Sequence, residues 1–175
     1  MSVTHVVLLG PMGAGKTTLG RALADRLEVD LVDSDEAILA LTGQSAADLA
    51  AGLGVPGLHD LERSLVLAAL ESHSRKVIAA AASVVDDEAT RQQMSRHLCL
   101  WVEADGAILA ERRESGPHRR QLSNEEADDL NRVRRLSVAN FVIGAVDTST
   151  STVEESAAVA TTILSTHLLR SDDSA

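Results

Sequence analysis

Residues 10–17 read Gly-Pro-Met-Gly-Ala-Gly-Lys-Thr and match the pattern G-x-x-x-x-G-K-[ST] at every fixed position. Glycines let a backbone curl so that its N–H groups point inward, where side chains would block an approaching phosphate. The lysine supplies a cation, and the hydroxyl of the threonine is a ligand for a magnesium ion. The run therefore predicts a loop that holds the phosphates of a nucleotide.

The segments on either side of this loop support the same interpretation. An apolar run at 6–9 predicts a buried strand, and residues 16–27 predict a helix with leucines on one face. A random chain of this length would match the pattern about once in a hundred cases, and the strand and helix context makes a chance glycine-rich turn rarer still. The residues expected to hold the nucleotide are Gly13, Ala14, Gly15, Lys16, Thr17 and Thr18, with Lys16 on the β- and γ-phosphates and Thr17 on Mg²⁺.

Two carboxylates, Asp33 and Asp35, follow the short apolar run Leu31-Val32. One aspartate in such a place can organise the water around Mg²⁺, and another can accept a hydroxyl proton and align that oxygen for attack on a γ-phosphate. The alternative is structural, because Ser34 or Asp35 would also cap the helix that follows. The nearby phosphate loop favours the functional interpretation.

Apolar runs alternate with helix-length amphipathic segments along the rest of the chain. Strands that are apolar on both faces and alternate with helices indicate a parallel sheet between two helical layers, which is an α/β three-layer sandwich. In such sheets ligands bind at the carboxyl ends of the strands. We expect strands at 6–9, 31–32, 77–80, 98–102 and 142–146, and helices at 16–27, 35–41, 58–71, 86–96, 105–114, 124–139 and 152–168, with a glycine- and proline-rich break at 52–57 and a polar, arginine-containing loop at 115–123.

Composition narrows the class of protein. The chain has 175 residues, a net charge of -10 and only 1% aromatic residues, so we expect one domain with an aliphatic core and no nucleic-acid partner. Its single cysteine, Cys99, cannot form an internal disulfide and is expected to be a buried apolar residue. Neither a signal peptide nor a membrane-length apolar run is apparent, which predicts a cytoplasmic protein that does not enter a membrane.

The order of these motifs resembles the shikimate kinase family, which belongs to the nucleoside-monophosphate-kinase-like branch of P-loop proteins. The resemblance is clearest up to about residue 41 and weaker beyond it. The matching segments are the phosphate loop with Met12 inside it, residues 20–24, Asp33-Ser34-Asp35, residues 58–62, residues 77–85, and Arg119-Arg120-Gln121-Leu122.

The resemblance implies ATP-dependent transfer of a phosphoryl group to a hydroxyl of a small molecule. By this likeness Asp35 would hold the reacting hydroxyl as a base, and Asp33 would lie near the metal. Arg119 would close over the phosphates from a small lid, and Arg112 would contact the nucleotide base. Arg134 or Arg132 would match the late arginine that binds the carboxylate of the substrate.

The chain departs from the family pattern in several places. The proline and tyrosine of the lid and late helix are absent, and the final nucleotide loop, which is usually arginine-rich before a proline, reads Asp147-Thr148-Ser149-Thr150-Ser151.

The other departures fall on the acceptor side. The family arginine that grips the substrate carboxylate is His59 here, which is mostly neutral at pH 7 and cannot make a bidentate fork. Ala81, Ala82 and Ser83 replace three glycines, and alanine restricts any backbone that needs a positive φ. Glu62 is present without its arginine partner. We interpret this pattern as a kept ATP half and a changed acceptor half, with Asp35, His59, Glu62, Ala81, Ala82 and Arg134 as the expected acceptor residues.

Three hypotheses remain open from sequence. The first is a small-molecule kinase whose acceptor is shikimate or an altered hydroxylated metabolite; the second is a degenerate ATP-binding paralogue with a regulatory role; the third is a nucleoside or nucleotide kinase. The first requires only a nucleotide, Mg²⁺ and a small acceptor as partners, and by analogy a monomer. We expect a single kinase domain at 1–170, with an acceptor-binding helical segment at about 34–72, a lid at about 113–124 and a frayed tail at 171–175.

Overall fold

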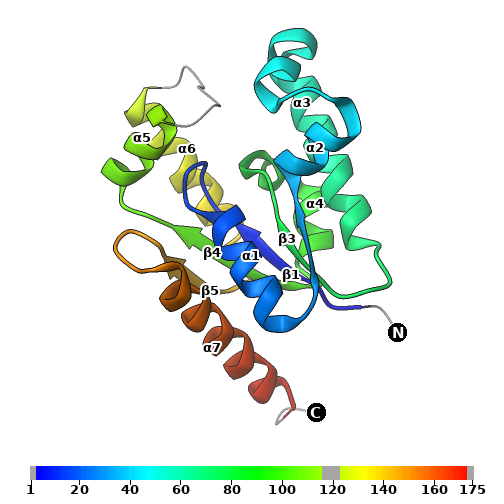
Figure 1. Cartoon of the computed structure of the whole chain (residues 1–175), viewed down its shortest axis with the longest axis vertical. Helices are drawn as coiled ribbons and strands as arrows, with labels where there is room; N and C mark the ends of the chain where they lie inside the picture. Colours follow the sequence, from blue (N-terminus) through cyan, green and yellow to red (C-terminus); the bar gives the residue numbers. More distant parts are fainter. Residues whose placement is uncertain (1–2, 116–122, 173–175) are drawn as a thin grey trace.

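A five-stranded parallel sheet forms the centre of the computed structural model, which describes residues 3–115 and 123–172 (Figure 1). The strands lie in the order β2-β3-β1-β4-β5, so the first strand of the chain is also the middle of the sheet. All four strand pairs are parallel, which confirms the expected α/β sandwich. The strands are β1 (Val6–Leu9), β2 (Asp30–Asp33), β3 (Lys76–Ala79), β4 (Leu98–Glu103) and β5 (Val142–Asp147).

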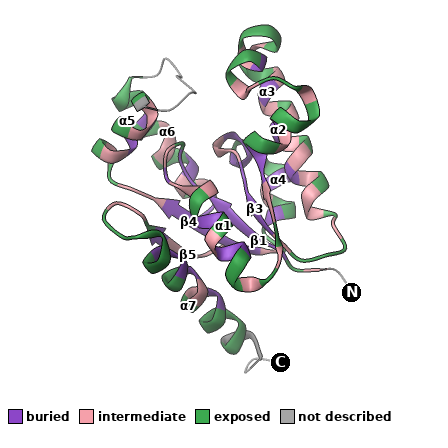
Figure 2. Cartoon of the chain, viewed as in Figure 1, coloured by how far each residue is buried: buried purple, intermediate pink, exposed green. Residues whose placement is uncertain are grey.

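Alternating side chains of the strands build two cores, one on each face of the sheet. Val6 and Leu8 of β1 pack into one apolar cluster, and Val7 and Leu9 pack into another, because successive side chains of a strand point to opposite faces. Helices α1, α5 and α7 contribute to the first cluster. Helices α3 and α4, the 3-10 helix η1 and Val138, directly after α6, contribute to the second. Figure 2 shows the resulting buried strands between partly exposed helices. The helices are α1 (Lys16–Leu27), α2 (Ser34–Thr42), α3 (Ala46–Leu70), the 3-10 helix η1 (Ala82–Asp86), α4 (Glu88–Met94), α5 (Gly106–Ser115), α6 (Asn124–Ser137) and α7 (Val153–Asp172).

Three expected boundaries are wrong. The break at 52–57 is confined to Gly54, which has φ 76° and ψ 163°, and helix α3 begins well before it with a capping box between Ser45 and Asp48. The helix expected at 86–96 begins only after Asp87, whose side chain caps it, and a 3-10 helix precedes it. Helix α7 continues to Asp172, so the expected tail is helical at 171–172, and 173–175 lie outside the described residues.

Cys99 is fully buried in the second cluster, as the sequence predicts. Its thiol donates to the carbonyl oxygen of Met94 at 3.2 Å, and burial raises its pKa to about 12. In the described part of the chain, no single helix is both long and apolar enough to cross a membrane; α2 and α3 meet that test only together, across a bend of 94°.

The close approach of β1 and β4 explains the first glycine of the phosphate loop. Gly10 has φ 145°, and a Cβ placed there would lie 2.0 Å from the carbonyl oxygen of Val102. That atom belongs to the backbone of β4 and cannot rotate away. Only glycine therefore lets the chain leave β1 and turn into the loop.

We expect Gly10→Ala to lower the free energy of unfolding by about 3 kcal/mol, because it adds both a backbone clash and an unfavourable φ. Urea denaturation of the variant and the wild type measures the change. Gly52→Ala is the matched control, since Gly52 lies in exposed helix with no atom within 4 Å of an added Cβ. The control should be unchanged or more stable by about 0.5–1 kcal/mol. Equal destabilisation of both variants would contradict this explanation.

Candidate active site

The topology brings three chain segments to one edge of the sheet. The phosphate loop follows β1, the acidic pair follows β2, and the Ala81-Ala82 segment follows β3, and these strands are neighbours in the order β2-β3-β1. Their carboxyl ends enclose a cavity of about 290 Å³. It is lined by Met12, Gly13, Gly15, Lys16, Thr17, Thr18, Asp33, Ser34, Asp35, Glu62, Ala79, Ala80, Ala81, Ala82 and Arg112.

Lys16 lies inside the phosphate loop. Its Nζ donates to the carbonyl oxygens of Gly10 and Pro11, each at 2.9 Å, so the ammonium is held across the loop. Burial lowers the pKa of Lys16 to about 8, and the nearby Asp35 and Asp33 carboxylates partly oppose that effect. The side chain therefore lies close to both aspartates and can respond electrostatically to a bound anion.

Asp33 performs two structural tasks with one carboxylate. Oδ2 accepts a hydrogen bond from the Thr17 hydroxyl at 2.7 Å, and Oδ1 accepts from the backbone N–H groups of Asp35 and Glu36 at 3.0 and 3.2 Å. Asp33 is thus the N-cap of α2, which corrects the expectation that Ser34 or Asp35 would be the cap. The structural and functional interpretations of this segment are compatible, because the cap leaves Asp35 exposed at the cavity.

Thr17 and Asp33 fit a magnesium ion by the chemistry of their donors. A hydroxyl and a carboxylate oxygen lie within hydrogen-bond distance of each other at the foot of the loop. Mg²⁺ prefers oxygen ligands and usually takes only one or two from the protein, with phosphates and water supplying the rest. In the described ranges no three His, Cys, Asp or Glu residues form a larger metal cage. The two residues are therefore suited to a metal that arrives with a nucleotide.

The segment after β3 is joined to α2 by its backbone. The N–H of Ala81 donates to the Ser34 hydroxyl at 3.1 Å. Ala81 has φ -59° and ψ 147°, and Ala82 begins the 3-10 helix, so neither position needs glycine. The alanines that replace the family glycines are therefore accommodated without backbone strain, and both line the cavity.

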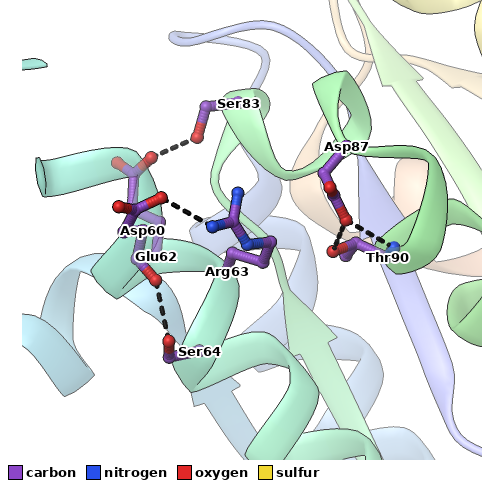
Figure 3. Close-up of polar contacts among 7 residues, drawn as sticks. All are labelled: Asp60, Glu62, Arg63, Ser64, Ser83, Asp87 and Thr90. Atoms are coloured by element: carbon purple, nitrogen blue, oxygen red, sulfur yellow. Dashed lines mark hydrogen bonds and ion pairs between the residues drawn. The ribbon is translucent and has the colours of Figure 1, made fainter. Parts of the chain in front are cut away.

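Glu62 is buried and reaches this segment from α3. It accepts a hydrogen bond from the hydroxyl of Ser83, as Figure 3 shows. Sequence reasoning identified Glu62 as having lost its arginine partner and missed Ser83 as the group that contacts it. The serine in place of the third family glycine was the available signal.

His59 and Arg134 do not line the main cavity. His59 lines a second cavity of about 210 Å³, together with Arg63, Ser83, Val84, Asp86 and Asp87. Arg134 is buried and paired with Asp86, whereas Arg132, the other candidate, pairs with Asp129 on the surface. Arg119, expected in the lid, lies outside the described residues.

Arg112 joins the phosphate loop to the end of β5. Its guanidinium donates to the carbonyl oxygen of Gly13 at 3.1 Å and to the Oγ1 and carbonyl oxygen of Thr148 at 3.1 and 3.0 Å. Thr148 in turn donates to the carbonyl oxygen of Ala14 at 2.8 Å. Sequence reasoning placed Thr148 in a nucleotide loop that departs from the family pattern but did not predict these contacts, because they join distant segments. A further cavity of about 280 Å³ adjoins this group and is lined by Gly15, Thr18, Leu19, Arg112, Thr148, Ser151, Val153 and Ser156.

The curated proteins to which this chain is similar include several shikimate kinases. The shikimate kinase of Thermobifida fusca is 41% identical over 106 residues, which are 61% of this chain and 61% of that protein. The shikimate kinase of Corynebacterium efficiens is 39% identical over 58% of this chain and 59% of its own length. That of Symbiobacterium thermophilum is 33% identical over 77% and 78%. The chain thus matches about three fifths of the length of the first two relatives.

Solved structures share the fold. The shikimate kinase from Acinetobacter baumannii in complex with shikimate superimposes with a TM-score of 0.84 at 23% identity, over 94% of this chain and 95% of that one. The shikimate kinase from Aquifex aeolicus gives 0.78 at 22% identity, over 95% and 99%. The likeness confirms the P-loop kinase architecture expected from the sequence.

The family model described as shikimate kinase matches residues 12–167. The match begins inside the phosphate loop and ends in the last helix, so it includes both sides of the main cavity. On this ground the chain belongs to the shikimate kinase family.

Proposed function

We propose that this chain is an ATP-dependent phosphotransferase that moves the γ-phosphoryl group of ATP to a hydroxyl of a small metabolite, as the name of its family describes. The observation that carries the proposal is the single cavity that holds Lys16, Thr17 and Asp35 together. A phosphate-binding cation and an exposed carboxylate on one cavity wall are what an in-line transfer needs.

The nucleotide occupies the loop side in this proposal. The backbone N–H groups of residues 13–18 and the ammonium of Lys16 hold the phosphates, and Thr17 and Asp33 hold Mg²⁺, which offsets phosphate charge when bound. The cavity beside Arg112 and Thr148 is the proposed place of the nucleoside. Because these two residues also bind the backbone of the loop, they couple the nucleoside region to the phosphate region.

The acceptor approaches from the side of α2 and α3. Asp35 accepts the proton of the acceptor hydroxyl while that oxygen forms a bond to the γ-phosphorus. The bond from this phosphorus to the β–γ bridging oxygen breaks, and its electron pair leaves with ADP. We propose residues 34–72 as the acceptor-binding segment, with Glu62, Ala81 and Ala82 in its wall, and residues 113–124 with Arg119 as the lid that excludes water.

The degenerate-paralogue hypothesis has no observation in its favour. Lys16, Asp33 and Asp35 all remain, and their contacts arrange them around one cavity. A nucleoside acceptor is likewise not favoured by any particular contact. Of the three hypotheses that the sequence left open, the small-molecule kinase is therefore the best supported.

We expect Asp35→Asn to lower kcat at least about a hundredfold, because it removes the proposed proton acceptor while keeping the shape of the side chain. ADP release from Mg-ATP, with shikimate and a set of uncharged polyols as acceptors, measures the rate. The affinity for Mg-ATP, measured by calorimetry, should change less than about twofold, since the proposed nucleotide contacts are intact.

Glu36→Gln is the matched control for this experiment. Glu36 is the next residue of α2, and its exposed side chain pairs with Arg21 on the surface. The control should keep wild-type kcat. The proposed function would be wrong if Asp35→Asn kept full activity. It would also be wrong if no acceptor raised the rate of ADP release above the rate that the protein shows without an added acceptor.

The low pKa of Lys16 predicts a pH-dependent affinity for ATP. Below about pH 8 the free protein carries the ammonium that attracts phosphate; above it the proton is lost and must be taken up again on binding. The Kd for Mg-ATP should be flat up to pH 7 and then rise, approaching about tenfold per pH unit above pH 8. In Lys16→Arg the guanidinium stays charged, so the same rise should be absent. An equal rise in both proteins would exclude Lys16 as its source.

A further inference from the structure

The second cavity continues the acceptor side of the first. Glu62 lines the main cavity and Ser83 lines the second cavity. The hydrogen bond between these two side chains marks the boundary between the two cavities. In Figure 3 the side chains of Arg63, Ser83 and Asp87 border the same region between α3 and the start of α4. An acceptor with its reacting hydroxyl near Asp35 would extend toward this region, so its charges decide which substituents the acceptor can carry.

Arg134 lies behind a carboxylate and not at the cavity wall. Its Nε and Nη2 donate to Oδ1 and Oδ2 of Asp86 at 2.8 and 2.5 Å, which is a bidentate pair. The arginine side chain is 6% exposed and the aspartate side chain 44%. Asp86 lines the cavity and Arg134 does not. The charged group that faces the cavity is therefore the carboxylate of Asp86, and the pair that it forms with Arg134 has no net charge.

The other charged side chains around the second cavity do not give it an excess of positive charge. Arg63 pairs with Asp60 at 2.6 Å. Asp87 accepts from the N–H and hydroxyl of Thr90 at 2.8 and 2.7 Å, and these bonds lower the pKa of its carboxyl. Arg91 lies near Asp87, where its charge also lowers the pKa of that carboxyl, and its guanidinium donates to the carbonyl oxygen of Val85 at 2.6 Å. Among the described residues, the three arginines Arg63, Arg91 and Arg134 thus stand against four carboxylates, which are those of Asp60, Glu62, Asp86 and Asp87.

We propose that Asp86 makes the acceptor site select an uncharged polyol over a polyol carboxylate. The proposal rests on the proposed kinase function and names the acceptor class within it. Shikimate is itself a carboxylate, so the inference separates this chain from the substrate in its family's name.

The physical reason is a repulsive element in the site. A carboxylate on the acceptor would either have to displace Asp86 from Arg134, which costs their bidentate pair, or lie beside the carboxylate of Asp86, where the two like charges repel. An uncharged hydroxyl or amide meets neither cost, and it can donate to Asp86 or Asp87. Selectivity against anionic acceptors thus follows from the position of Asp86 between Arg134 and the cavity, although the chain has an arginine at position 134.

The first test compares two acceptors that differ only in charge, shikimate and its carboxamide. Their kcat/KM values with saturating Mg-ATP are measured on the wild-type protein. We expect the carboxamide to be favoured by about tenfold or more. A preference for shikimate would overturn the proposal, and its loss in Arg63→Gln would then assign carboxylate binding to Arg63. If neither compound nor a set of uncharged polyols accepted phosphate, the kinase function itself would fail, and this proposal with it.

The second test changes one charge. Asp86→Asn should expose the positive potential of Arg134 and shift the carboxamide-to-shikimate ratio toward shikimate by about tenfold. Asp87→Asn also removes one negative charge from this cavity, but it leaves the pair of Arg134 and Asp86 intact. Asparagine at this position can still cap α4. This control should shift the ratio by less than about threefold. Equal shifts in both variants would overturn the role of Asp86.

Folding of the variants is checked by their melting temperature and their affinity for Mg-ATP. If Asp86→Asn does not fold, Asp86→Glu keeps the charge and should keep the wild-type preference. A reversed preference in Asp86→Glu would overturn the proposal. The comparison of the two acceptors on the wild-type protein depends on neither variant.

Discussion

One buried carboxylate, that of Asp33, joins the two halves of the site. It accepts from the Thr17 hydroxyl on the helix of the phosphate loop and from two backbone N–H groups at the start of α2. These three bonds fix the distance between the loop that would hold a γ-phosphate and the helix that carries Asp35. Because the strands that lead to the two segments are separated only by β3, the sheet order makes this contact possible.

The two halves differ in how their charges are arranged. On the nucleotide side, Lys16 and Arg112 donate to backbone carbonyl oxygens of the phosphate loop, so both cations are held at the place where phosphates would lie. On the acceptor side, Arg63 and Arg134 are each paired with a carboxylate. The cations of the nucleotide side therefore bind the loop itself, whereas those of the acceptor side bind carboxylates. This contrast agrees with a kept phosphate site and a changed acceptor site.

The fold could be predicted from sequence where the signal was local. The phosphate loop, the five strands and the burial of Cys99 follow from short patterns. The site was harder, because its defining contacts join distant positions: Arg134 and Asp86 are 48 residues apart, and Thr148 and Ala14 are 134 apart. Nothing in the local sequence marks such pairs. The first part of α3 was missed for a different reason, since its glycines and proline suggested a longer break than the single residue that leaves the helix.

The central claim is that phosphate moves from ATP to a carbon-bound hydroxyl in the cavity between Lys16 and Asp35. The most direct measurement is a phosphorus NMR spectrum of the protein with Mg-ATP, shikimate and a set of uncharged polyols. The account predicts that the γ-phosphate signal falls while a phosphomonoester signal grows in the same amount as ADP. An unchanged spectrum, or growth of inorganic phosphate alone, would contradict it.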